Sequence, residues 1–256
     1  MRFPLTIAAI ALAVLMSSAA AAALQESGDP LGSARWADME KTFIAGAPMR
    51  FDPRVKVIAP LTAENPMQVP VTVDATALEN VVEVIVFADF NPIVQILRFY
   101  PEATGAYLGF RVKLQQSTPV RAAARTADGV WHVGGTWVNT VGGGCTAPSA
   151  AAGSPIWQQR LNEVSGRQWS EGAQSGRVRL RIVHPMDTGL VAGTPAFHLE
   201  EINFTNASGQ RLMRLQTFEP VAENPVFTLN RGEIAGEVEA SGRDNNGNAF
   251  RARIAP

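Results

Sequence analysis

From Val55 onward the chain consists of short apolar or alternating runs that are broken by proline, glycine, asparagine and aspartate. Alternation of apolar and polar side chains is typical of strands that have one face in a core. We expect one series of strands before residue 141 and a second series after residue 176. The predicted strands are Val55–Ala59, Val69–Asp74, Val81–Ala88, Val94–Phe99, Tyr107–Leu114, Val120–Arg125, Val130–Val138, Arg177–Val183, Pro195–Phe204, Gln210–Phe218, Val226–Leu229, Ile234–Ala240 and Ala249–Ile254.

Short strands at this spacing are typical of β-sandwiches of the immunoglobulin type. Residues 142–154 are rich in glycine, alanine, serine and proline, so they form the natural boundary between the two series. The sequence therefore predicts an all-β protein with two immunoglobulin-like β-sandwich domains and short flanking helices. We expect the first sandwich over residues 24–145, a linker with a short helix over 146–175, and the second sandwich over 176–256.

Two short segments have helical spacing instead. The first is Ser33–Gly46, in which glycine is a suitable stop and Trp36, Met39 and Phe43 share one face. The second is expected to begin at Ser154 and Pro155, as an N-cap followed by proline at the first helical position. Its apolar face would carry Trp157, Leu161 and Val164.

The N-terminus has the pattern of a secretory signal peptide. Arg2 precedes an apolar run from Leu5 to Met16, and a string of alanines that ends at Ala23 supplies a small-residue cleavage site. The apolar run is too short to span a bilayer comfortably. We therefore expect residues 1–23 to be removed and the mature protein to lie in the periplasm, without membrane insertion.

Charge and cysteine count exclude two further classes. The chain has 22 basic and 23 acidic side chains and a formal net charge of −1, which argues against nucleic-acid binding because that function needs a basic footprint. With one cysteine in an oxidising compartment, an internal disulfide is excluded. The thiol must stay free, pair with another molecule or carry a group.

That cysteine, Cys145, follows Gly142, Gly143 and Gly144. Glycine leaves the backbone free on both sides of φ, so this run predicts a flexible arm that exposes a reactive thiol. The competing interpretation is a small buried hydrophobe, which free cysteines often are. Nucleophilic catalysis needs a base and an oxyanion hole in fixed alignment, to which a swinging arm is badly suited. The pattern favours a carrier without a catalytic site of its own, and we expect no cofactor beyond an adduct on Cys145.

Metal binding is the first alternative. The imidazoles of the chain are His132, His184 and His198, and Met186 and Met213 add soft ligands. A blue-copper site needs cysteine, histidine and methionine close together on one loop, which the residues after Cys145 do not provide. We therefore expect no metal site and take His132 as an outward or half-buried strand residue. Copper handling by Cys145, His132 and Met186 stays a weaker hypothesis.

One further segment, His184–Gly189, follows a predicted strand. Proline at 185 would end the strand, and the side chains of Asp187 and Thr188 can turn the chain by hydrogen bonding to the backbone. This structural explanation needs no ligand.

Together these segments resemble the sulfur-carrier pair SoxY and SoxZ, fused into one chain. The SoxY-like half contains Val57–Pro60, Ala63–Asn65, Val69–Val71 and Asn91-Pro92, and it ends at Cys145, where SoxY has its terminal Gly-Gly-Cys-Gly. The SoxZ-like half is carried by Arg179–Val183, His184–Gly189 and Asn224-Pro225.

The resemblance implies that Cys145 bears sulfur intermediates, as a persulfide or an S-thiosulfonate, and presents them to periplasmic redox enzymes or c-type cytochromes. Gly142, Gly143 and Gly144 would be the swinging arm, and His184, Met186 and Asp187 candidate interface residues. Thr146 replaces the expected last glycine, and the arm is tethered at both ends. Fused carriers of this kind are associated with quinoprotein dehydrogenases. A non-covalent docking module for such a dehydrogenase or a cytochrome remains the alternative.

Overall fold

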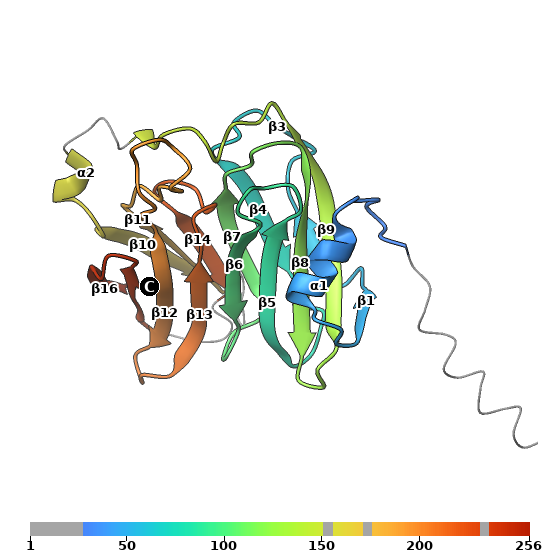
Figure 1. The fold of residues 1–256 in the computed structure, drawn as a ribbon. Coiled ribbons are helices and arrows are strands. Elements are labelled where there is room, and N and C mark those ends of the chain that lie inside the picture. Colours follow the sequence, from blue (N-terminus) through green and yellow to red (C-terminus); the bar gives the residue numbers. More distant parts are fainter. Residues whose placement is uncertain (1–27, 151–155, 171–175, 231–235) are drawn as a thin grey trace, which may run out of the picture.

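Two β-sheets stacked face to face form the protein (Figure 1). The computed structural model describes residues 28–150, 156–170, 176–230 and 236–256. The predicted signal peptide, with Ser154 and Pro155, lies outside the described residues. In the described part no helix is long and apolar enough to cross a membrane.

Among the described residues, ten strands form the larger sheet and six the smaller one. The larger sheet runs in the order β1 (Met49–Phe51), β9 (Trp131–Thr140), β8 (Thr118–Thr126), β5 (Val81–Ala88), β6 (Gln95–Tyr100), β13 (Arg211–Thr217), β12 (Leu199–Asn206), β15 (Val238–Asp244) and β16 (Ala249–Ile254), with β3 (Thr62–Ala63) beside β9. The smaller sheet runs β10 (Val164–Ser170), β11 (Gly176–Ile182), β14 (Val226–Asn230), β7 (Tyr107–Val112), β4 (Val69–Asp74) and β2 (Lys56–Ile58).

Both sheets run through both halves of the chain. In the larger sheet β6 of the first half pairs antiparallel with β13 of the second, and in the smaller sheet β7 pairs with β14. The prediction of an all-β fold with short flanking helices is confirmed. The two predicted sandwiches, however, are joined edge to edge, because pairing satisfies the backbone groups that two sheet edges would otherwise expose. The predicted domain boundaries stay a prediction.

The burial of side chains explains the pattern of apolar and polar residues along the strands. Along β4 the valines Val69, Val71 and Val73 are buried and the residues between them are more exposed, which is the alternation of a strand with one covered face. Strand β5 is apolar almost throughout because its outward residues are covered as well: Ile85 and Phe87 pack under helix α1.

Helix α1 (Trp36–Phe43) lies within the predicted Ser33–Gly46 and covers the outer face of β5, β8 and β9 (Figure 1). Its Met39 is buried, and the ring of Phe43 stacks on Phe87 with centroids 4.6 Å apart. The backbone leaves the helix through positive φ at Ala45 and Gly46, which confirms the glycine stop.

The second predicted helix is largely wrong. Helix α2 covers only Ile156–Gln159, and Val164 opens strand β10, which pairs antiparallel with β11 over its whole length. This strand was missed because it lies at the edge of the smaller sheet. An edge strand with one solvent-facing side carries many polar residues and lacks a clear apolar period. Strands β1 and β3 were also missed, since each is only two or three residues long.

Candidate functional site

The glycine run before the cysteine packs tightly across the segment that follows β7. Gly143 N donates to Gln115 O at 2.9 Å and Gly144 N donates to Leu114 O at 3.0 Å. A Cβ on Gly144 would overlap the Pro66 carbonyl oxygen, and Gly142 and Gly143 both have a φ of +86°. The glycines thus serve close backbone approach and left-handed geometry in this structure, rather than leaving the chain free.

The thiol at the end of this run is buried. Cys145 is 0% exposed, and its Sγ lies 3.4 Å from the carbonyl oxygen of Lys113. Its backbone N donates to Gln115 Oε1 at 3.2 Å, and its carbonyl accepts from Thr188 Oγ1 at 2.7 Å. The expectation that the arm exposes Cys145 is therefore wrong for this conformation. The physical reason is that Gly142 and Gly144 let the segment pack where a side chain would overlap the backbone of Gln115 and of Pro66.

Asn91 holds the segment on which the glycine run packs. Its Nδ2 donates to Lys113 O at 2.9 Å, and its Oδ1 accepts from Gln115 N at 2.9 Å. Asn91 is itself buried. One side chain therefore fixes the backbone on both sides of Leu114, which is the backbone that Cys145 contacts.

Lys113 places a buried ammonium beside the thiol. Its side chain is almost fully buried, and Nζ donates to the carbonyl oxygens of Met186 and of Glu219, the latter at 3.4 Å. Burial lowers the pKa of Lys113 to about 8, although a thiolate at Cys145 would favour its charged form. Burial likewise raises the pKa of Cys145 to about 11, against the pull of Lys113. At neutral pH the docked cysteine is thus a protonated thiol, the less reactive form.

The segment His184–Gly189 closes this site from the second half of the chain. His184 and Met186 are buried and Asp187 is half-buried. Met186 contributes the carbonyl that accepts from Lys113, and Thr188 contributes the hydroxyl that donates to Cys145. These candidate interface residues lie at the internal junction between the halves, rather than on an open surface.

His184 is held in the neutral state within that segment. Its Nδ1 accepts from Met186 N at 3.1 Å, and its Nε2 lies 3.6 Å from Asp244 Oδ2. Burial lowers the pKa of His184 to about 4, in spite of the nearby Asp244 carboxylate. Met186 has a φ of +52°, so the backbone turns sharply directly after Pro185.

His132 lies outside the site around Cys145. It is buried on β9, with Nδ1 2.7 Å from Asp52 Oδ2 and Nε2 3.3 Å from Thr126 Oγ1. The prediction of an outward or half-buried residue is wrong because the Asp52 carboxylate gives the ring a partner inside. Within the described residues no group of three or more His, Cys, Asp or Glu side chains could hold a metal ion. The structure gives no support to copper handling by Cys145, His132 and Met186.

Lys113 and Gln115 were not predicted as residues of the site, and Thr188 was predicted only to turn its own segment and not to contact Cys145. A signal for Lys113 was present, since it is one of three lysines in the chain and follows an apolar strand directly. The amide of Gln115 and the hydroxyl of Thr188 carried no such signal, because their roles depend on contacts between distant segments.

Two protein families match the chain, one in each half. Residues 39–145 match sulfur oxidation protein SoxY, and residues 168–255 match sulphur oxidation protein SoxZ. The chain is a SoxY domain fused to a SoxZ domain. The resemblance seen in the sequence is confirmed at this level, and the family is one of sulfur carriers rather than of enzymes.

Likeness to solved structures is low. The sulfur carrier protein SoxY from Chlorobium limicola f thiosulfatophilum is 17% identical, with 42% of this chain and 96% of that chain covered and a TM-score of 0.35. A β-glucuronidase from Parabacteroides merdae is 11% identical, with 78% and 24% covered and a TM-score of 0.25. TM-scores of this size do not bear on function. No curated protein matches the SoxY–SoxZ chain.

Proposed function

We propose that this SoxY–SoxZ fusion is a periplasmic carrier that bears sulfur intermediates covalently on Cys145 and presents them to partner enzymes. The observation that carries the proposal is the position of this thiol. Cys145 is the sole cysteine of the chain and the last residue of the SoxY match. The resemblance of Gly142–Cys145 to the terminal Gly-Gly-Cys-Gly of SoxY supports Cys145 as the sulfur attachment point.

Because the thiol of Cys145 is buried, the segment Gly142–Ala147 must move away from its packed position before the thiol can react. A thiolate is the nucleophile in exchange at sulfur, and a thiol whose pKa is raised to about 11 supplies very little of it at neutral pH. Undocking breaks the contacts of Cys145 with Gln115, Lys113 and Thr188 and removes the desolvation that raises the pKa. The docked state then protects the bare thiol, and the undocked state allows exchange at its sulfur.

Two loading reactions fit a single thiol. A persulfide forms when the Cys145 thiolate attacks the outer sulfur of a partner's persulfide, so that the partner's thiolate leaves and no net oxidation occurs. An S-thiosulfonate forms from the thiol and thiosulfate with loss of one proton and two electrons. The second reaction needs an oxidant, for which a c-type cytochrome is the proposed acceptor. A quinoprotein dehydrogenase is the further partner that the fused organisation suggests.

Intact-mass measurement of the chain purified from its native periplasm tests the proposal, with and without reductant. We expect a reductant-labile mass increase on the wild type and none on Cys145→Ser, because serine cannot form a reducible sulfur bond. A control for folding is an unchanged circular dichroism spectrum in the variant. A bare thiol, even after exposure to thiosulfate and sulfide with periplasmic extract, would refute the carrier function.

The alternative is a non-covalent docking module in which the thiol is incidental. The burial of Cys145 and its raised pKa favour this second candidate, since a permanently docked thiol would carry nothing. The two candidates differ in one variant. A docking module keeps its partners in Cys145→Ser and carries no adduct in the wild type, whereas a carrier loses its adduct in that variant.

A further inference from the structure

The outer face of the smaller sheet carries a concentration of arginines that the sulfur site does not use. Four of them, Arg111 on β7, Arg167 on β10 and Arg179 and Arg181 on β11, are together called the arginine face below. All four are exposed. They alternate with buried residues such as Val178 and Leu180, so the core-facing side of the strands is apolar and the outward side is cationic.

Strand register places these residues beside one another. Directly paired residues in neighbouring strands share one face of a sheet. One row across the sheet is Thr72, Gly109, Thr228, Arg179 and Arg167. In the next row Pro70 pairs with Arg111 on one side, and Val226 pairs with Arg181 on the other. The arginine face therefore crosses the seam between the SoxY and SoxZ halves.

The charges of this face are balanced only in part: the carboxylate of Glu163 interacts electrostatically with Arg181, but without an ion-pair contact. Among the described residues no carboxylate lies within ion-pair distance of Arg111, Arg167, Arg179 or Arg181. By contrast, Arg251 and Arg253 on β16 of the larger sheet lie 3.0 and 3.4 Å from Glu239 and Glu237. Since the whole chain has a net charge of −1, the positive charge is a local feature of the arginine face.

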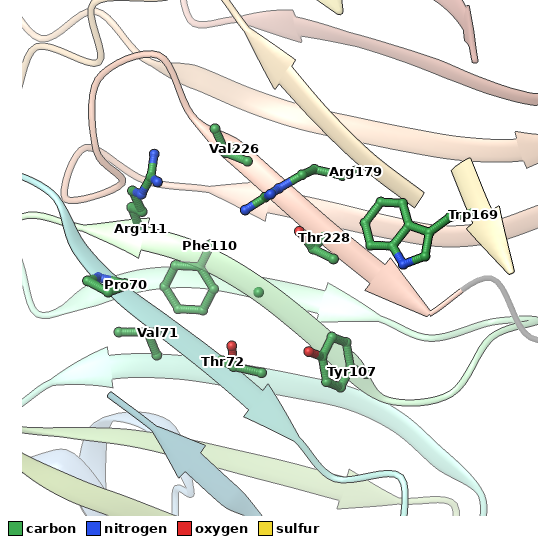
Figure 2. A pocket seen from close by; sticks show the side chains of 11 residues that line it. Pro70, Val71, Thr72, Tyr107, Phe110, Arg111, Trp169, Arg179, Val226 and Thr228 are labelled. Atoms are coloured by element: carbon green, nitrogen blue, oxygen red, sulfur yellow. The ribbon is translucent and has the colours of Figure 1, made fainter. Parts of the chain in front are cut away.

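The arginine face is hollowed and has aromatic side chains at one end. Two adjoining hollows of about 290 and 450 Å³ share Arg111 and Arg179 in their lining. Figure 2 shows Arg111 and Arg179 on the Val226 side of the first hollow, with Tyr107 and Trp169 toward its other end. Arginine, tryptophan and tyrosine are the side chains most often found at the energetic centres of protein interfaces.

The distances between the four arginines determine what kind of anion can contact all of them. The distance from β7 to β10, across β14 and β11, is about 14 Å at the usual strand spacing. Along β11, Arg179 and Arg181 are about 7 Å apart. One tetrahedral oxyanion spans only a few ångströms and can contact one pair of these guanidinium groups. A protein surface that presents several carboxylates can engage all four.

We propose that the arginine face is the docking surface for an acidic region of a partner protein. Charge complementarity is the basis of this assignment. The position of the face relative to the thiol adds to it. Arg111 lies two residues before Lys113, and the carbonyl of Lys113 contacts Cys145 Sγ. A partner seated on the arginine face would therefore reach the end of β7 at which the carrier segment docks.

This inference deepens the proposed function, because it names the surface through which a carrier meets its partner. It does not depend on the cargo. Cys145→Ser leaves every residue of the arginine face unchanged, so failure to find an adduct and failure to find acidic docking are separate results.

The test uses the full mature chain and a fluorescein-labelled hexaglutamate peptide as the acidic probe, followed by fluorescence anisotropy. We expect binding at about 20 mM salt that weakens strongly by about 300 mM, where the screening length becomes short. The double variant R179Q/R181Q should bind at least about tenfold more weakly, as loss of two interface arginines predicts.

The matched control is R251Q/R253Q. It removes the same two charges at the same i, i+2 spacing, but from an exposed strand of the other sheet. We expect this variant and Cys145→Ser to bind the probe like the wild type. Equal weakening in both double variants would overturn the proposal, as would absence of binding at low salt. Displacement of the peptide by an equal concentration of sulfate would also overturn it, because it would show a site for one small oxyanion.

Discussion

At the scale of single residues, one buried arginine links the N-terminal segment to the larger sheet. Arg121 is 1% exposed, and its guanidinium pairs with Asp29 at 2.6 Å and with Asp89 at 3.1 Å. It also lies over the ring of Trp36, 4.7 Å from the centroid. Burial raises the pKa of Asp89, which hydrogen bonding from Ser33 and the charge of Arg121 partly offset. The arginine is therefore the main counter-charge for two carboxylates.

Replacement of Arg121 by methionine is expected to lower the free energy of unfolding by about 3–5 kcal/mol, because it leaves buried carboxylates without a partner. Urea unfolding at neutral pH measures the change. The control is Arg211→Met, whose pair with Glu102 is exposed and should contribute less than about 1 kcal/mol. Similar losses in the two variants would show that the cluster around Arg121 has no special role.

Individual strands were predictable where burial enforces a pattern. The bounds of β4, β5 and β16 agree with the prediction because their side chains either alternate or are covered on both faces. Strand β10 was not predictable, since an edge strand is specified by pairing with β11 rather than by its own periodicity. The candidate site likewise contains one residue that was predictable from the sequence and others that were not. Cys145 was found from its type, whereas Gln115 and Thr188 act through contacts between loops that no local pattern encodes.

The contact between two loops, Gly142–Ala147 and His184–Gly189, is expected to control access to the thiol. Thr188→Val removes the hydrogen bond to the Cys145 carbonyl while keeping the side-chain shape. A hydrogen bond of about 0.5–1.5 kcal/mol predicts up to about tenfold faster reaction of the thiol with an aromatic disulfide reagent. Stopped-flow absorbance follows this reaction.

Thr194→Val is the control for this experiment, because Thr194 lies nearby in the chain and its substitution leaves the Cys145 contacts in place. Its reaction rate should equal that of the wild type. If Thr188→Val reacted no faster than the wild type, the loop contact would not limit access to Cys145.

At the scale of the whole molecule, the two continuous sheets couple the halves into one folding unit. A single cluster of buried apolar residues extends from the first half to the second; Phe99 and Leu108 belong to it, as do Leu215 and Leu229. A group that titrates in one half therefore affects the stability of the entire fold.

His184 is expected to make stability depend on pH. Its pKa is about 4 when folded and about 6.5 when unfolded, so the unfolded chain binds the additional proton between these values. The free energy of unfolding should fall by roughly 3 kcal/mol as the pH decreases from about 6.5 to 4, and this contribution changes no further below that window. Asp244, His198 and Lys113 are the ionisable groups that influence the ring.

Urea unfolding of the wild type and of His184→Gln at about pH 7 and pH 4.5 tests this linkage. The variant should lose most of the stability difference between the two conditions, because glutamine does not titrate. Parallel pH profiles for the two proteins would contradict a neutral buried His184.

The edge-to-edge sheets have a consequence for how the protein behaves in the cell. A carrier built from two separate subunits must assemble, and its dissociation increases on dilution. Here one polypeptide contains both the thiol and the loop that closes over it, so their encounter is intramolecular and independent of concentration. Every molecule that folds therefore has the two parts in one-to-one stoichiometry, and no exchange with free subunits can leave the sulfur atom uncovered.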